Sequence, residues 1–189
     1  LNFSKSRLSF FNHFPSLTVT LYDFSLKGSA PYKKDTLVAA QEVAFGINLK
    51  RLLFDNEVRI DQIYLSESLV NVKVNEKGQA NYNVYIADGQ QSTDTVSNTS
   101  IKLARIDISN CHLRYADQSL HLRVEAHGFN YLGKGDLSHA VFDLKTEASI
   151  DSLDFNYAGK DYLLHKKITA DLVTRINTNS LAFAFQKND

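Results

Sequence analysis

The histidines and the single cysteine are the side chains whose chemistry best suits catalysis or metal binding. The chain has six histidines and one cysteine, Cys111. His121 and His127 share one face of an expected strand, but this separation spans about 20 Å, too far for one metal ion. His112 would lie across from His121 if their strands pair, which is the best metal-ligating combination that the spacing offers. Solvated surface histidines explain the same pattern more simply, so we expect no metal site.

Cys111 is followed directly by His112, and a Cys–His pair is a known route to nucleophilic catalysis. Adjacent strand residues point to opposite faces, so this imidazole cannot readily activate the thiol. Cys111 shares a face with Leu113 and Tyr115, which favours a small core residue. The sequence also lacks GxSxG, a GxGxxG after a strand, GxxxxGK[ST] and HExxH. We therefore expect a protein that is not an enzyme and that uses no cofactor.

Charge and composition exclude further classes of protein. The 189 residues carry 21 basic and 21 acidic side chains, so the formal net charge is zero. This balance leaves no electrostatic footprint for DNA or RNA, and we expect no nucleic-acid partner. The hydrophobic fraction of 43% is too high for a disordered chain. No apolar run approaches the roughly 20 residues of a membrane-spanning helix.

Alternation of apolar and polar residues with period two dominates the chain. This pattern predicts strands with one apolar face and one wet face, as in antiparallel sheets. The clearest alternating sets are Val43, Phe45 and Ile47; Val70, Val72 and Val74; Leu120, Leu122 and Val124; Phe142 and Leu144 with Thr146, Ala148 and Ile150; Ile168, Ala170 and Leu172; and Leu181, Phe183 and Phe185.

Two stretches change face partway and predict β-bulges. Leu17, Val19 and Leu21 give way to Tyr22, Phe24 and Leu26, and Val58 and Ile60 give way to Ile63 and Leu65. Helix signals are limited to a short segment ending at Phe11, capped by Ser4 or Ser6, and a single turn at 49–54. The fold class we expect is mainly β. It is a long, curved and twisted antiparallel sheet with one apolar face and one or two short helices, either an open groove or closed like a sandwich.

A polar, aperiodic segment divides the chain. Residues 87–100 contain one core-forming residue, Val96, and are expected to form a surface loop or linker. We expect a first β region over residues 1–86 and a second over residues 101–189 that continues the sheet.

Four segments in the first region resemble the AsmA family. They are HFPSLTVTLYDFSLKGSAP from His13, LVAAQEVAFGINLKRLLF from Leu37, the strand from Val58 to Leu69, and NVKVNEKGQANYNVY from Asn71. Their order and spacing match the family over most of residues 8–86, and their sequences are most similar to those of relatives of Bacteroidetes type. Residues 101–189 match only through Ile106-Asp107-Ile108 and the Leu113-x-Tyr115-x-Asp117 pattern.

This resemblance implies a non-enzymatic segment of the cell envelope. Members of the family are periplasmic, anchored in the inner membrane by a helix that would precede Leu1, and associated with outer-membrane assembly. They are built as a long β-sheet that holds lipid in an apolar groove. The implied partners are a phospholipid or another acyl-chain ligand and the inner membrane, and the open strand edges could also pair with a second copy.

If this implication holds, alternating apolar side chains line the groove. The expected lining residues are Val43, Phe45, Ile47, Val70, Val72, Val74, Leu120, Leu122, Val124, Phe142 and Leu144. The alternative function is a cell-envelope β-sandwich that binds protein or glycan, because Tyr32, Tyr131 and Tyr162 lie in loop-like surroundings and sugars stack on aromatic rings.

Overall fold

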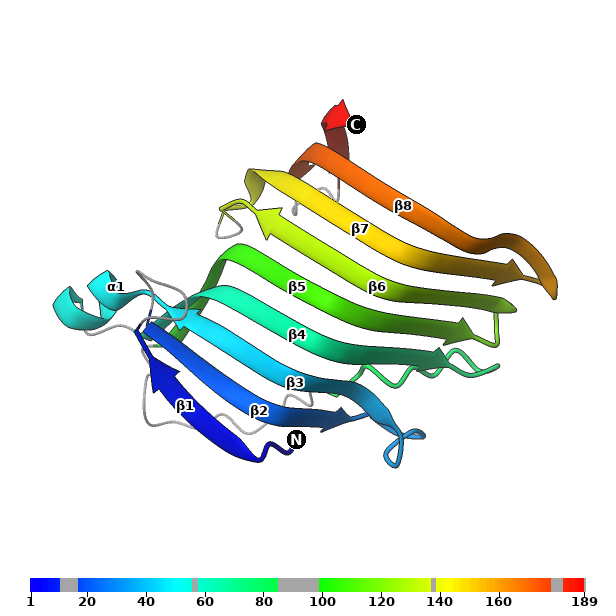
Figure 1. Ribbon diagram of the computed structural model, residues 1–189, viewed down its shortest axis with the longest axis horizontal. Coiled ribbons are helices and arrows are strands. Elements are labelled where there is room, and N and C mark those ends of the chain that lie inside the picture. The colour runs from blue at the N-terminus through cyan, green and yellow to red at the C-terminus, as the bar shows by residue number, and fades with distance from the viewer. Residues whose placement is uncertain (11–16, 56–57, 85–98, 137–138, 178–181, 189) are drawn as a thin grey trace.

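In the part of the chain that the structure describes, nine strands form one sheet in the order in which they occur in the sequence (Figure 1). The computed structural model describes residues 1–10, 17–55, 58–84, 99–136, 139–177 and 182–188. The elements are β1 (Lys5–Ser9), β2 (Leu17–Lys27), β3 (Thr36–Ile47), α1 (Leu49–Phe54), β4 (Val58–Val74), β5 (Thr99–Asp117), β6 (Leu122–Lys134), β7 (Val141–Tyr157), β8 (Lys160–Asn177) and β9 (Ala182–Asn188). The prediction of a mainly β protein is confirmed.

One pair of neighbouring strands departs from the expected antiparallel arrangement. β4 and β5 are parallel, whereas all other neighbours in the sheet are antiparallel. A parallel pair requires a connection long enough to return the chain to the start of the strand. Residues 75–98 make this connection, and the predicted loop over 87–100 falls largely within residues 85–98, which lie outside the described part of the chain.

The sheet is a single open layer. Substantial contacts between elements are those between neighbouring strands and between α1 and β4. The accessible surface is 12484 Å², whereas a compact protein of 21.3 kDa exposes about 9,100 Å². No second layer covers either face within the described residues, so the sandwich-like alternative is wrong and the open sheet is correct.

The strands of the sheet curve together (Figure 1), and residues with left-handed backbone occur at corresponding positions in several of them. Positive φ angles occur at Asp23 in β2, Glu67 in β4, Asn110 in β5, Gly128 in β6 and His165 in β8. The strand registers place Glu67 opposite Asn110. They also place both Asp23 and Glu67 opposite Gln41 of β3. We call these five residues the bend row. An L-residue in this conformation costs about 1–2 kcal/mol, so its repetition across the sheet is a specific structural feature.

The bend row displaces the apolar alternation by one residue while the apolar side chains stay on one face. Ile108 lies opposite Tyr131, and Cys111 lies opposite Phe129. The rings of Phe129 and Tyr131, two residues apart, lie side by side with centroids 6.2 Å apart. Ile108 and Cys111 therefore share a face although they are three residues apart, which a regular strand does not allow. In β2 the predicted change of face occurs at Asp23 through its left-handed backbone, without the register shift of a β-bulge. The bulge predicted in β4 is confirmed by a register shift between Ile60 and Gln62.

The two helix predictions have opposite outcomes. The turn at 49–54 is confirmed as α1, which begins where the Asn48 side chain accepts a hydrogen bond from the Arg51 backbone nitrogen. The helix expected before Phe11 is wrong, because residues 5–9 form β1, which pairs with β2 over its whole length. The ladder hydrogen bonds between β1 and β2, in which Leu8 lies opposite Val19, outweigh the local capping signal.

We predict that Gly128→Ala destabilises the protein more than Gly159→Ala does. Both glycines have positive φ, so both substitutions carry the same backbone strain. A Cβ atom at Gly128 would also collide with the Asp151 carboxylate, whereas one at Gly159 would meet no atom within 4 Å. We expect the free energy of unfolding, measured by thermal and urea melts, to fall by about 1–3 kcal/mol for Gly128→Ala. Equal losses at the two sites would show that the packing of the bend row is not constrained.

Asp117 closes the turn between β5 and β6. Its carboxylate accepts hydrogen bonds from Ser119 Oγ at 2.6 Å, from the Leu120 backbone nitrogen at 3.0 Å and from the Tyr115 hydroxyl at 3.1 Å. The hydrogen bond from Ser119 is the main cause that lowers the pKa of Asp117 below its ordinary value, against the opposing effect of burial. Because the folded-state pKa is lowered, this carboxylate stabilises the fold above its ordinary pKa, and the stabilisation is lost as the pH falls through the folded-state value.

We predict that Asp117→Asn lowers the melting temperature at neutral pH and that this deficit shrinks in acid. An amide keeps part of the hydrogen bonding but has no charge, so its contribution does not titrate with this carboxyl group. Melting temperatures of wild type and variant should converge as the pH is brought below the ordinary pKa of 3.8. A deficit that stays constant over this range would contradict the assignment.

Candidate functional site

The apolar face of the sheet is the largest candidate surface, and the bend row divides it into two parts. We call the part that contains Phe45 the first arm and the part that contains Val72 the second arm. Two rows of directly opposed residues cross the first arm: Leu8, Val19, Phe45, Ile63 and Ile106; and Leu21, Val43, Leu65, Ile108, Tyr131, Ala148 and Ala170. Side chains opposed in this way pack against each other across the strands.

The second arm carries two similar rows on the same face. They are Leu26, Val38, Val70, Leu113, Ala126 and Leu153; and Val72, Tyr115, Val124, Phe155 and Leu163. The apolar surface thus extends from β1 to β8, and the one charged residue at the end of these rows is Lys166 of β8, which lies opposite Leu153. Contiguous exposed apolar surface on this scale marks a binding surface in most soluble proteins.

The predicted lining residues fall into two groups on this face, with one exception. Val43, Phe45 and Ile47 lie in β3, and Phe142 and Leu144 in β7, all on the first arm; Val70, Val72 and Val74 lie in β4, and Leu122 and Val124 in β6, all on the second arm. Leu120 is the exception. It lies in the turn before β6, which begins at Leu122, and its side chain is 56% exposed. The hydrogen bond from the Leu120 nitrogen to Asp117 fixes that turn.

The apolar residues that join these groups were missed as lining residues, chiefly those of β5. Ile106 and Ile108 join β4 to β6 on the first arm, and Leu113 and Tyr115 do so on the second. Their alternation is even-numbered before Asn110 and odd-numbered after it, so no single period-two pattern covers the strand. An asparagine between two alternating sets of opposite parity is the signal that could have revealed the displacement.

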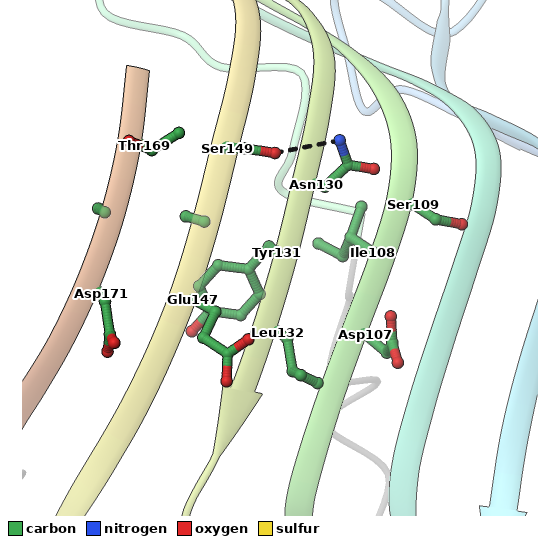
Figure 2. Close-up of a pocket in the computed structure, with 12 residues that line it drawn as sticks. Asp107, Ile108, Ser109, Asn130, Tyr131, Leu132, Glu147, Ser149, Thr169 and Asp171 are labelled. Carbon is green, nitrogen blue, oxygen red and sulfur yellow. Dashed lines mark hydrogen bonds between the residues drawn. The ribbon is translucent and has the colours of Figure 1, made fainter.

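A hollow of about 640 Å³ lies between β5 and β8 (Figure 2), and carboxylates and hydroxyls line it together with apolar residues such as Ile108 and Leu132. Asp107, Glu147 and Asp171 contribute carboxylates, and Asn130 donates a hydrogen bond to Ser149 Oγ at 3.3 Å. These residues alternate with the apolar row of Ile108, Tyr131, Ala148 and Ala170, and therefore project from the opposite, polar face. Carboxylates and hydroxyls cannot solvate hydrocarbon, so the hollow is distinct in chemistry from the apolar face.

The other residues considered in the sequence analysis have mixed outcomes. His112 does not approach His121, which lies in the turn before β6; instead, its ring stacks on that of His127 with centroids 3.9 Å apart. Cys111 is buried at 2% exposure, as expected for a core residue. Of the three tyrosines expected in loops, Tyr32 lies in a turn, whereas Tyr131 and Tyr162 lie within β6 and β8.

Among the described residues, the structure contains no helix that is long and apolar enough to cross a membrane. Helix α1 has six residues.

Fold and surface together define a class of protein: an open, bent β-sheet of one layer that exposes a continuous apolar face. The family model of the AsmA family matches residues 10–166, and the chain belongs to this family. No curated protein and no solved structure matches the chain. Membership supports a role in the cell envelope connected with outer-membrane assembly.

One of the segments that resemble the family has a clear structural purpose. Asn81, in the sequence Gly78-Gln79-Ala80-Asn81-Tyr82, is fully buried. Its side chain accepts a hydrogen bond from the Lys73 backbone nitrogen at 2.9 Å and donates one to the Asn71 carbonyl oxygen at 2.7 Å. The motif therefore fastens the segment after β4 to the end of that strand.

We predict that Val72→Asp is tolerated by the fold. Val72 lies on the open apolar face, so a carboxylate there stays hydrated and mainly removes the packing of one valine, at a cost of about 1–2 kcal/mol. Asn71→Asp, one residue earlier on the polar face, is the matched control with the same added charge. Thermal melts of dilute protein should show cooperative unfolding for both variants. Loss of the folded state in Val72→Asp alone would mean that this face is a dry core.

Proposed function

We propose that this chain is a periplasmic segment of a Bacteroidetes-type AsmA protein that holds phospholipid acyl chains against its apolar face. The full-length protein would be anchored in the inner membrane by a segment outside this chain and would act in lipid homeostasis of the outer membrane. The proposed activity is binding and conduction of lipid without catalysis. The observation that carries the proposal is the continuous apolar face from β1 to β8, which no other element covers within the described residues.

The chemistry of this face suits hydrocarbon. Acyl chains need apolar contact and few hydrogen bonds, and each buried CH₂ group contributes about 0.8 kcal/mol. The four apolar rows offer such contact on both arms, whereas the carboxylates around Asp107 and Glu147 lie on the opposite face. Because these rows are apolar except for Lys166 at the β8 end of one of them, the face would retain lipids through their chains and would select weakly among head groups.

The dimensions of the sheet also suit a lipid path. Neighbouring strands are about 4.8 Å apart, so the nine strands extend over roughly 38 Å. This length is comparable to the hydrocarbon thickness of a bilayer, roughly 30 Å. The apolar rows run across the strands, and lipids held against them could therefore follow one another along the direction in which the strands stack.

The test is native mass spectrometry of protein extracted gently from bacteria, with Val72→Asp and Asn71→Asp as the matched pair. Wild type and Asn71→Asp should carry co-purifying phospholipid, and Val72→Asp should lose most of it, because the charge lies in the hydrocarbon path. A fluorescent phospholipid offered in detergent micelles should bind with the same ranking.

Two results would overturn the proposal. One is the absence of lipid from all folded forms of the protein, and the other is equal lipid content in the two variants. Sedimentation at several protein concentrations serves as the control for a second copy covering the apolar face. A dimer that excludes lipid would favour the alternative function, in which this face binds protein.

A further inference from the structure

Two histidines and a glutamate converge on the polar face of the second arm. The ligand atoms of His112, Glu125 and His127 all lie within 4.8 Å of one another. His112 Nε2 is 2.8 Å from Glu125 Oε1, and His127 Nε2 is 3.6 Å from the same oxygen. Ligand atoms in a tetrahedral zinc site, with bonds of about 2.0–2.1 Å, are separated by roughly 3.3 Å. The two observed separations lie on either side of this value.

The fold fixes this cluster through strand pairing. His112 lies in β5 directly across from the part of β6 that contains His127, because the next residue, Leu113, lies opposite Ala126. Glu125 lies two residues from His127 and therefore on the same face. The side chains of His112, Glu125 and His127 are 24%, 31% and 49% exposed, so the cluster is ordered by its neighbours but open to ions from solution.

The contacts of His112 Nε2 with Glu125 and with Arg114 cannot both be hydrogen bonds at the same time. Arg114 Nε lies 2.9 Å from Glu125 Oε1 and 3.2 Å from His112 Nε2. If His112 Nε2 carries a proton, it can donate to Glu125 but cannot accept from Arg114. If Nε2 is unprotonated, its lone pair faces the carboxylate oxygen. A cation that accepts both lone pairs removes this conflict, and the Arg114 guanidinium partly does so.

The surroundings keep the carboxylate ionised. Burial raises the pKa of Glu125, but the hydrogen bonds from Arg114 and His112 outweigh it and hold this pKa below its ordinary value. The neighbouring Asp154, opposite Glu125 on β7, is held by the His165 backbone nitrogen at 2.6 Å.

We propose that His112, Glu125 and His127 form a binding site for a divalent transition-metal ion, with Zn²⁺ the best match. Two imidazoles and one carboxylate suit zinc and its neighbours in the transition series, whereas Ca²⁺ and Mg²⁺ prefer oxygen ligands. Three protein ligands leave a position for water. Arg114, whose side chain is 51% exposed, moves away from His112 when the ion binds. The ion links β5 to β6 across the second arm and is independent of lipid on the opposite face.

The experiment is titration of the whole chain with Zn²⁺ by isothermal calorimetry, with the shift in melting temperature as a second measurement. Wild type should bind one ion per chain and melt at a higher temperature when loaded. His112→Gln and His127→Gln should each weaken binding by at least about tenfold and lose most of the thermal shift. His139→Gln, a change at a histidine outside the cluster, should bind as wild type does.

Arg114→Gln gives a further readout, because it removes the competing cation and keeps the length and polarity of the side chain. We expect it to bind Zn²⁺ at least as tightly as wild type does. Circular dichroism of each variant establishes that the sheet is intact. The proposal is overturned if wild type binds no Zn²⁺, or if folded His112→Gln and His127→Gln bind it as tightly as wild type.

Discussion

The structure depends on left-handed backbone conformations at corresponding positions in most of its long strands. Placed opposite one another, as Glu67 and Asn110 are, such residues displace both strands together and preserve the ladder. The sheet therefore bends as a unit. Because the displacement is one residue, the apolar side chains before and after the bend stay on one face.

This bend explains how a single layer can offer two surfaces of different chemistry. The apolar rows that contain Ile63 and Val72 share one face, although in β4 one of these residues is odd-numbered and the other even-numbered, on either side of Glu67. The other face carries the carboxylates of the hollow at Asp107 and, on the second arm, the cluster around Glu125. The apolar rows and the cluster of His112, Glu125 and His127 are thus separated by the thickness of one sheet.

Local patterns predicted much of this fold and failed where pairing partners decide the outcome. Alternation predicted the strands, and the short turn at 49–54 and the slip at Asp23 follow from nearby residues. The chain near Ser9 carries a helix-like signal, yet it forms β1 because β2 offers it a ladder. The parallel pairing of β4 and β5 depends on the path of a long connection, which alternation does not encode.

By itself, the sequence determined the class of fold, the apolar character of one face and the membership suggested by the motif around Asn81. These properties are local, because a period of two and a short motif are contained within neighbouring residues. Tertiary structure alone decided that the sheet stays open, that Leu120 leaves the apolar face and that His112 meets His127 instead of His121. The reason is that register between strands, together with the extra residue at each bend, sets which side chains meet, and both depend on residues far apart in the chain.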